Sequence, residues 1–241
     1  MAFYLIGTGM NKKSISADAL ETLKTCDKVY LENYTVNFPY PIKELEKIFE
    51  VKITELERSA VEDESILEEA KNSNIALLVY GDSLSATTHM QLILECKKQS
   101  IEYAVFHAAS IIITIAETGL SLYKFGKTAS MPNWKEHTNK PTSFMNYIKN
   151  NASIQAHTLI LTDIGLEINN AIEQLIESSK QTEIELPEKI IAISNAATPN
   201  QKIFYDTPEV IGKQNIPMPF CLIIPSNLHF MESDALEELK E

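Results

Sequence analysis

The stretch Ile75-Ala-Leu-Leu-Val-Tyr-Gly-Asp-Ser-Leu-Ser-Ala-Thr-Thr-His89 decides the fold. Its first part, up to Tyr80, is a nearly continuous apolar run, which is typical of a parallel strand that is buried on both faces. The small and polar residues from Gly81 to His89 indicate a loop at the carboxyl end of that strand. In open α/β sheets ligands bind at this edge, where small residues let a ligand approach the backbone. The stretch therefore predicts an α/β sheet with a small-molecule site after Tyr80.

Short apolar runs alternate with amphipathic segments through the first half of the chain. The predicted strands cover residues 3–6, 28–31, 51–53, 76–80 and 103–106, and the predicted helices cover residues 17–26, 42–49, 61–71 and 88–98. This alternation predicts a parallel sheet covered by helices.

The pattern changes after Ser110-Ile-Ile-Ile113. Strands are predicted over residues 127–131, 157–162, 189–194 and 220–224, and helices over residues 143–150, 169–179, 208–213 and 233–241. We therefore expect an N-terminal α/β domain of residues 1–112 and a C-terminal mixed α/β domain of residues 113–241. Because no long Gly/Ser linker separates them, we expect the two domains to form one cleft.

Composition excludes several classes of function. The formal net charge is −12 and the basic residues form no stripe, which disfavours nucleic-acid binding. The longest apolar runs are far shorter than the roughly 20 residues of a membrane helix, and the N-terminus lacks the features of a signal peptide. Cys26, Cys96 and Cys221 show no zinc-ligand spacing. We expect a cytoplasmic protein with reduced thiols, no membrane partner and no metal.

Gly7-Thr8-Gly9 follows the first predicted strand, as a dinucleotide-binding fingerprint does. The third glycine of that fingerprint is missing, because Lys12 stands in its place. The glycines then indicate either a tight turn or a contact with another ligand.

The hydroxyl groups of the loop from Gly81 to His89 have two interpretations. Ser85 or Thr87 can cap the helix that follows, or bind a ligand, and the same alternatives hold for Ser110. The five histidines show no metal-ligand spacing, and we expect none of them to be catalytic.

Several motifs, in the same order along the chain, resemble the diphthine synthase family, which belongs to the tetrapyrrole-methylase type of S-adenosylmethionine-dependent methyltransferases. The motifs are Tyr4-Leu-Ile-Gly-Thr-Gly9, Gly81-Asp82 with Ala86-Thr-Thr-His89, His107-Ala-Ala-Ser-Ile111, Thr118-Gly-Leu120, Tyr123-Lys-Phe-Gly126, His157-Thr-Leu159 and Leu228-His-Phe-Met-Glu232. The resemblance runs from Met1 to about residue 240, and it implies a two-domain tetrapyrrole-methylase-like fold.

The resemblance implies that S-adenosyl-L-methionine binds, folded, in a cleft between the two domains, and leaves as S-adenosyl-L-homocysteine. Carried over position by position, the donor contacts are Met10, Asp82, Ser85, Ser110, Ile111, Thr162, Ala196 and Phe220. Methyl transfer from a sulfonium requires alignment of an activated donor, so no catalytic triad is needed. The sequence identifies no catalytic residue.

The acceptor that the resemblance implies is the amino group of a 3-carboxy-3-aminopropyl unit on a histidine of elongation factor 2, a step of diphthamide biosynthesis. A homodimer is implied as well. Three methyl groups on the nitrogen, or four including an ester, are both compatible with the sequence. The alternatives are another tetrapyrrole-methylase-type enzyme, acting on a corrin precursor, and a non-catalytic partner protein with the donor-binding fold.

Four positions depart from the usual pattern of the family. Ser83 and Ala109 replace frequent prolines, Asn195 lies in a run that usually contains Ala-Arg-x-Gly-Ser, and Phe220 stands where a polar residue is common. The departures at Ser83, Asn195 and Phe220 motivate the non-catalytic alternative.

Overall fold

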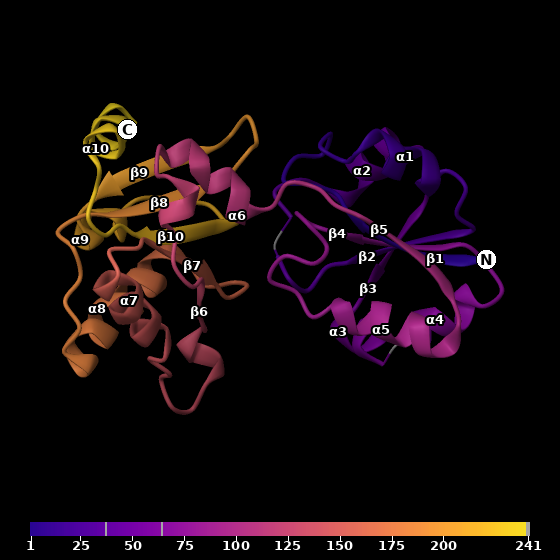
Figure 1. The fold of residues 1–241 in the computed structure, drawn as a ribbon, viewed down its shortest axis with the longest axis horizontal. Helices are drawn as coiled ribbons and strands as arrows, with labels where there is room; N and C mark the ends of the chain where they lie inside the picture. Colours follow the sequence, from indigo (N-terminus) through magenta and orange to yellow (C-terminus); the bar gives the residue numbers. More distant parts are fainter. Residues whose placement is uncertain (37, 64, 240–241) are drawn as a thin grey trace. The chain divides into compact units, whose positions relative to one another are not determined.

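The computed structural model describes residues 1–36, 38–63 and 65–239. The chain divides into two compact units, residues 1–111 and 112–241 (Figure 1). That the chain has two domains with a boundary after residue 112 stays a prediction.

The first unit alternates strands with helices. Its elements are β1 (Ala2–Gly7), α1 (Ala17–Leu23), β2 (Lys28–Glu32), α2 (Ile42–Phe49), β3 (Ile53–Leu56), α3 (Arg58–Glu62), α4 (Ser65–Ala70), β4 (Ile75–Val79), α5 (Met90–Gln99) and β5 (Glu102–Phe106). The strands pair in parallel in the order β3-β2-β4-β1-β5. The predicted parallel sheet covered by helices is confirmed.

The apolar run of β4 is continuous because helices cover both faces of the sheet. Ile75, Leu77 and Val79 pack toward α3, α4 and α5, whereas Ala76 and Leu78 pack toward α1 and α2. Figure 1 shows the two groups of helices on opposite faces of this sheet. Successive side chains of a strand point to opposite faces, so a central strand between two helical layers needs an apolar residue at every position.

The single helix predicted over residues 61–71 is wrong. Two short helices, α3 and α4, lie in this region, and residue 64 of the predicted helix lies outside the described residues. The Asp63 side chain accepts a hydrogen bond from the Ser65 amide at 2.9 Å. Such a local bond competes with continuation of a helix.

The second unit contains a mixed sheet. Its elements are α6 (Ile111–Thr114), which starts at the division between the units, β6 (Ala129–Met131), α7 (Phe144–Ser153), β7 (Thr158–Thr162), α8 (Ile168–Thr182), β8 (Ile190–Ser194), β9 (Lys202–Asp206), α9 (Pro208–Ile211), β10 (Phe220–Ile224) and α10 (Phe230–Glu238), with 3-10 helices at Ile115–Thr118, Leu122–Lys124 and Trp134–Glu136. The strand order is β6-β7-β10-β8-β9. Only the pair β6–β7 is parallel among the pairs of this sheet's described strands. The predicted mixed α/β architecture is confirmed.

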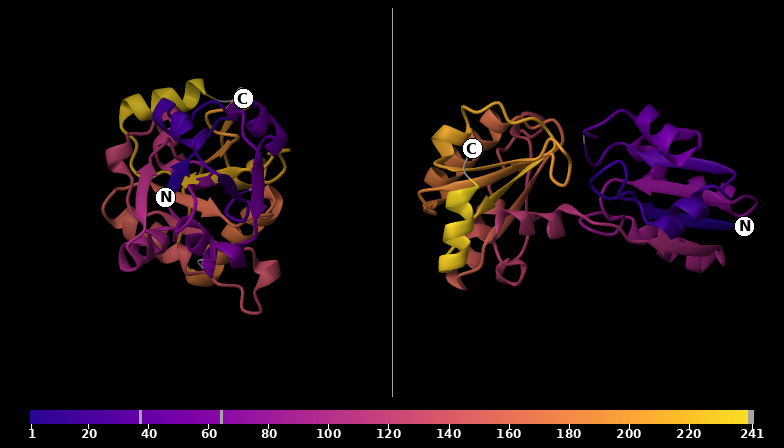
Figure 2. Two further views of the ribbon diagram at one scale, coloured as in Figure 1. Left: turned by 90° about the vertical axis from the view of Figure 1, so that its right-hand side faces the viewer. Right: turned by 90° about the horizontal axis from the view of Figure 1, so that it is seen from above.

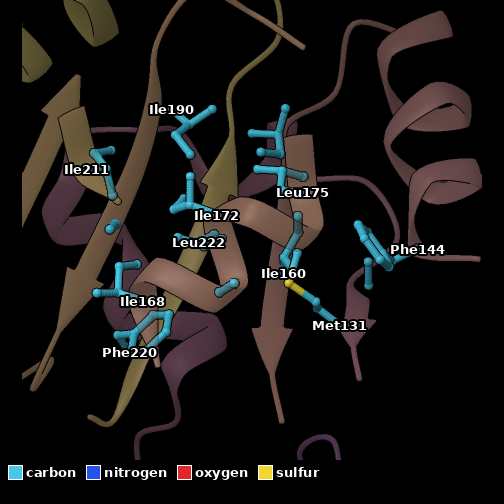
Figure 3. Close-up of a cluster of buried hydrophobic side chains, with 14 of the residues drawn as sticks. Met131, Phe144, Ile160, Ile168, Ile172, Leu175, Ile190, Ile211, Phe220 and Leu222 are labelled. Carbon is cyan, nitrogen blue, oxygen red and sulfur yellow. The ribbon is translucent and has the colours of Figure 1, made fainter. Parts of the chain in front are cut away.

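The core of the second unit lies between its sheet and the helices α7, α8 and α9. Figure 3 shows Phe144, Ile172 and Leu175 from the helices beside Ile160 and Leu222 from the strands. The last helix, α10, lies on the other side of this sheet (Figures 1 and 2).

The start of α10 differs from the prediction. The helix begins at Phe230, not at residue 233, and the last two residues of the predicted helix lie outside the described residues. His229 and Glu232 form a capping box, in which each side chain accepts a hydrogen bond from the backbone of the other end of the first turn. This cap fixes the helix start earlier than the apolar pattern indicates.

Among the described residues, no helix is long and apolar enough to span a membrane.

Candidate functional site

The loop that follows β4 is joined to the loop that follows β1. Gly9 and Gly81 exchange two backbone hydrogen bonds, of 3.0 and 3.1 Å, and both have positive φ angles, +73° and +72°. Glycine adopts such angles without steric cost. The two glycine motifs of the sequence therefore form one structure at the carboxyl edge of the parallel sheet.

Gly7 allows these loops to approach closely. A Cβ atom at position 7 would lie 2.7 Å from the Gly81 carbonyl oxygen and 3.1 Å from the Asp82 Cα. No side chain fits there without moving the backbone of the β4 loop. The Gly7-Thr8-Gly9 motif thus has a packing role in this fold.

Met10 and Ser110, which were also predicted to contact the methyl donor, lie beside Gly81. A Cβ atom built on Gly81 would lie 3.7 Å from the Met10 Sδ and 3.7 Å from the Ser110 Cα. Met10 and Ser110 are both buried, and Ile111 follows directly. These predicted donor contacts of the first unit therefore lie beside one another at the Gly81 loop.

The Asp82 carboxylate holds the loop together. Its Oδ1 accepts hydrogen bonds from the Leu84 amide at 3.0 Å and from the Ser85 hydroxyl at 3.2 Å. Its Oδ2 accepts from the His107 Nδ1 at 2.8 Å and from the Ala108 amide at 3.2 Å. Two carboxylate oxygens offer about four acceptor positions, so this carboxylate is saturated by its own unit.

The pKa of Asp82 is lowered. Burial works to raise it, but the hydrogen bond from His107 and those from the Leu84 and Ala108 amides outweigh the burial. Asp82 is therefore ionised at neutral pH.

From the sequence, none of the histidines was expected to be catalytic, and His107 appeared only as part of a family motif. Its side chain is 68% exposed, although its Nδ1 is bound to the buried Asp82 carboxylate. Asp82 follows β4 and His107 follows β5, and β1 lies between these strands. The contact depends on the order of strands in the sheet, which no local spacing in the sequence shows.

A second buried carboxylate, Glu32, ends β2 at the same edge of the sheet. The Thr35 hydroxyl donates to its Oε1, and its Oε2 has no hydrogen-bond partner among the described residues. Burial raises the pKa of Glu32 to about 7, although hydrogen bonds from Thr35 and Tyr34 oppose the shift.

Three predicted donor contacts lie near one another in the second unit. The Thr162 hydroxyl, at the end of β7, donates to the Phe220 carbonyl oxygen at 3.0 Å. Ala196 follows Asn195, whose amide donates to the Pro219 carbonyl oxygen at 2.9 Å. The Phe220 ring belongs to the hydrophobic core (Figure 3).

The motifs of the second unit meet at Glu232. Its carboxylate accepts hydrogen bonds from the Lys124 ammonium, the Ser121 amide at 3.0 Å, the His229 amide at 2.8 Å and the His157 Nε2 at 3.5 Å. Burial works to raise the pKa of Glu232, but the bonds from Lys124, His229 and Ser121 hold it far below its ordinary value. Lys124 and His157 were quoted in the sequence as family motifs, and here they form a buried network.

The described residues contain no group of three or more His, Cys, Asp or Glu side chains that could hold a metal ion. Cys26, Cys96 and Cys221 are free thiols, and burial raises the pKa of the Cys26 and Cys96 thiols to about 11.

Comparison with known proteins gives consistent matches. The family model of tetrapyrrole (corrin/porphyrin) methylases matches residues 2–210. Diphthine methyl ester synthase of Schizosaccharomyces pombe is 32% identical over 97% of this chain and 93% of its own length, and diphthine synthase of Methanococcus vannielii is 35% identical over 98% of both. A crystal structure of a diphthine synthase has a TM-score of 0.90 and 33% identity, covering 100% of this chain and 96% of that one. The chain therefore belongs to the tetrapyrrole methylase family, in its diphthine synthase branch, and is a methyltransferase.

Proposed function

We propose that the chain transfers methyl groups from S-adenosyl-L-methionine to the amino group of the 3-carboxy-3-aminopropyl unit on a histidine of elongation factor 2. The observation that carries the proposal is the likeness to diphthine synthase over 98% of both chains. Methyl transfer to nitrogen needs a close, aligned and dry contact between the amine and an activated methyl group, which S-adenosyl-L-methionine supplies when bound.

The edge around Gly81 fits a ligand of this kind. Met10 and Ser110 flank a position without a side chain, and Ile111 follows Ser110. We propose that these residues contact the donor through backbone atoms and through the Met10 thioether. The saturated Asp82 carboxylate and the Ser85 hydroxyl hold the loop, and the ionised carboxylate adds a negative charge that favours a sulfonium ligand.

The second unit is proposed to contribute Thr162, Ala196 and Phe220 to donor binding. Because the Phe220 ring is buried in the core and its carbonyl is bound to Thr162, its contribution is a backbone one. Because the side chain at position 220 packs in the core, a phenyl ring can stand where the family often has a polar residue.

The reaction has consequences for location and assembly. An enzyme that modifies elongation factor 2 acts where translation takes place, and we propose a cytoplasmic protein. We also propose a homodimer, as the family implies, and no nucleic-acid or membrane partner, in keeping with the net charge of −12.

The decisive experiment compares acceptors. Purified protein and labelled S-adenosyl-L-methionine are incubated with elongation factor 2 that carries the 3-carboxy-3-aminopropyl group, with the unmodified factor and with a corrin precursor. Mass spectrometry of the acceptor peptide is expected to show a gain of one or more methyl groups on the modified factor only. Equal labelling of the unmodified factor, or labelling of the corrin precursor alone, would contradict the proposal.

Calorimetric titration with S-adenosyl-L-homocysteine completes this test. We expect binding together with a rise in thermal stability, because a ligand that binds only the folded state stabilises it. Neither binding nor transfer would be observed for the non-catalytic alternative that the departures at Ser83 and Asn195 suggested.

A further inference from the structure

We propose that His107 accepts the proton that the acceptor amine must lose before each methyl transfer, and that Asp82 positions the His107 ring for this role. This inference rests on the proposed function and deepens it, because it assigns the base that the sequence leaves unnamed.

The Asp82 carboxylate holds the His107 ring at one of its two nitrogens. The Asp82 side chain is only 10% exposed and lies 2.8 Å from the His107 Nδ1, while the His107 side chain is 68% exposed. Among the described residues, Asp82 is the charged group that contacts the His107 ring. A buried carboxylate thus holds one side of a ring whose other side faces solvent.

The hydrogen bond to Asp82 fixes the tautomer of the neutral His107 ring. An ionised carboxylate only accepts hydrogen bonds, so in the neutral ring the proton that joins the pair is on Nδ1. The lone pair of a neutral ring is then on Nε2, which has no partner among the described residues. The same arrangement of carboxylate and imidazole prepares the base in hydrolase triads, where the carboxylate fixes the tautomer and stabilises the imidazolium.

His107 lies near the proposed donor-binding residues of the first unit. His107 follows β5 and lies three residues before Ser110, whose Cα is 3.7 Å from the Cβ position of Gly81. The base and the proposed donor-binding residues therefore share the carboxyl edge of one sheet.

The other described histidines lack this combination. His89 and His157 are buried, and His229 caps α10. His137 is exposed, and its side chain is bonded to no carboxylate among the described residues. His107 alone among them combines exposure with a carboxylate on one ring nitrogen.

The ammonium of the acceptor gives a proton to the His107 Nε2, and the ring becomes an imidazolium beside the Asp82 carboxylate. The free nitrogen pair forms a bond to the methyl carbon, and the electrons of the breaking carbon–sulfur bond go to sulfur. The imidazolium then returns its proton to solvent. Each further N-methylation again needs removal of one proton, because every product short of the quaternary ammonium is protonated.

Transfer to a carboxylate oxygen differs, since the attacking oxygen carries no proton. The curated relative from Schizosaccharomyces pombe has the name of a methyl ester synthase. Ester formation on an already trimethylated acceptor is therefore an internal control that uses the same donor and the same protein.

The test is His107→Gln, with His137→Gln as the matched control. We expect His107→Gln to lower the rate of N-methylation about 100-fold, which is within the range of general base catalysis. The loss should shrink as the pH is raised from 7 to 9.5, because solvent then deprotonates the amine. His137→Gln should behave like the wild type at every pH. Ester formation, where the wild type catalyses it, should change less than threefold in His107→Gln.

Two readouts do not depend on turnover. His107→Gln should still bind S-adenosyl-L-homocysteine, with an affinity that is weakened no more than about fivefold, as in Ser85→Ala, so the donor site is intact while N-methylation falls about 100-fold. Long-range ¹H–¹⁵N spectra of the ring should show the Nδ1–H tautomer in the wild type and its loss in Asp82→Asn.

An unchanged N-methylation rate in His107→Gln, or a loss that is the same at every pH, would overturn the inference. An Nε2–H tautomer in the wild type would do the same. Failure of the wild type to methylate elongation factor 2 would instead refute the proposed function.

Discussion

The Asp82 cluster of the first unit and the Glu232 cluster of the second are built from the same parts. Each has a buried carboxylate that accepts four hydrogen bonds, and each contains a histidine. The histidines differ. His107 is 68% exposed and is bound through Nδ1, whereas His157 is fully buried, with Nε2 facing Glu232 and Nδ1 accepting from the Ser226 amide at 2.9 Å.

The comparison shows what turns a carboxylate–histidine pair into a structural or a reactive group. Both nitrogens of His157 are occupied, and burial lowers the pKa of His157 more than the Glu232 charge raises it. The ring stays neutral, and neither of its nitrogens is open to solvent or to a substrate. One nitrogen of His107 faces solvent, so its ring can take up a proton. Access to the second nitrogen separates the two roles.

The largest expected effect is on the Glu232 cluster. Glu232→Ala removes the partner of the Lys124 ammonium and an acceptor of two amides, so we expect the free energy of unfolding of the second unit to fall by about 4 kcal/mol. Denaturant unfolding followed by Trp134 fluorescence measures it. Glu177→Ala, which breaks the exposed pair with Lys140 at 3.0 Å, should change it by less than about 1 kcal/mol. Equal effects of the two variants would refute the structural role of the cluster.

Glu32 is another buried carboxylate, and its pKa is shifted in the opposite direction from that of Glu232. Its pKa is raised to about 7 in the folded state, so the folded protein binds more protons than the unfolded one between about pH 4 and pH 7. Stability from this group is present at low pH and lost as the pH rises through 7. Glu32→Gln should remove a penalty of about 3 kcal/mol at pH 8 and little at pH 4. Urea unfolding of both proteins across this range measures the difference, and parallel curves would contradict the raised pKa.

The smallest expected effect is that of Ser85, whose hydroxyl bonds to the Asp82 carboxylate. Ser85→Ala removes one hydroxyl bond to Asp82, so we expect a loss of about 1 kcal/mol in the stability of the first unit. Binding of S-adenosyl-L-homocysteine should weaken about fivefold, as measured by calorimetry. Ser59→Ala, at an exposed position of α3, is the control and should change neither quantity.

The sequence predicts the fold best where burial dictates every residue. The continuous apolar runs at β4 and β10 identify central strands, because both faces of each are covered. Strand β9 was missed, since Ile203 is its only buried residue and edge strands carry mixed residues. Periodicity does not reveal the end of α3 at Glu62, after which the Asp63 side chain accepts a hydrogen bond from the Ser65 amide.

In the candidate site, the glycine loops were predictable because their backbone angles and close contacts require glycine. The saturation of Asp82 and the exposure of His107 were not, since they arise from two loops 25 residues apart in sequence that meet across β1. The donor contacts carried over from the family stay predictions.

The position of β10 has a consequence for the order of events during synthesis. This strand stands in the middle of the second sheet, between β7 and β8, although it comes last in sequence among the described strands. While the ribosome makes the protein, the pairs β6–β7 and β8–β9 cannot join into one sheet until β10 emerges. The first unit has all of its strands by residue 106 and can fold meanwhile. A transcript that ends before codon 220 would thus leave one finished sheet joined to a half-built one, with unpaired strand edges that invite aggregation.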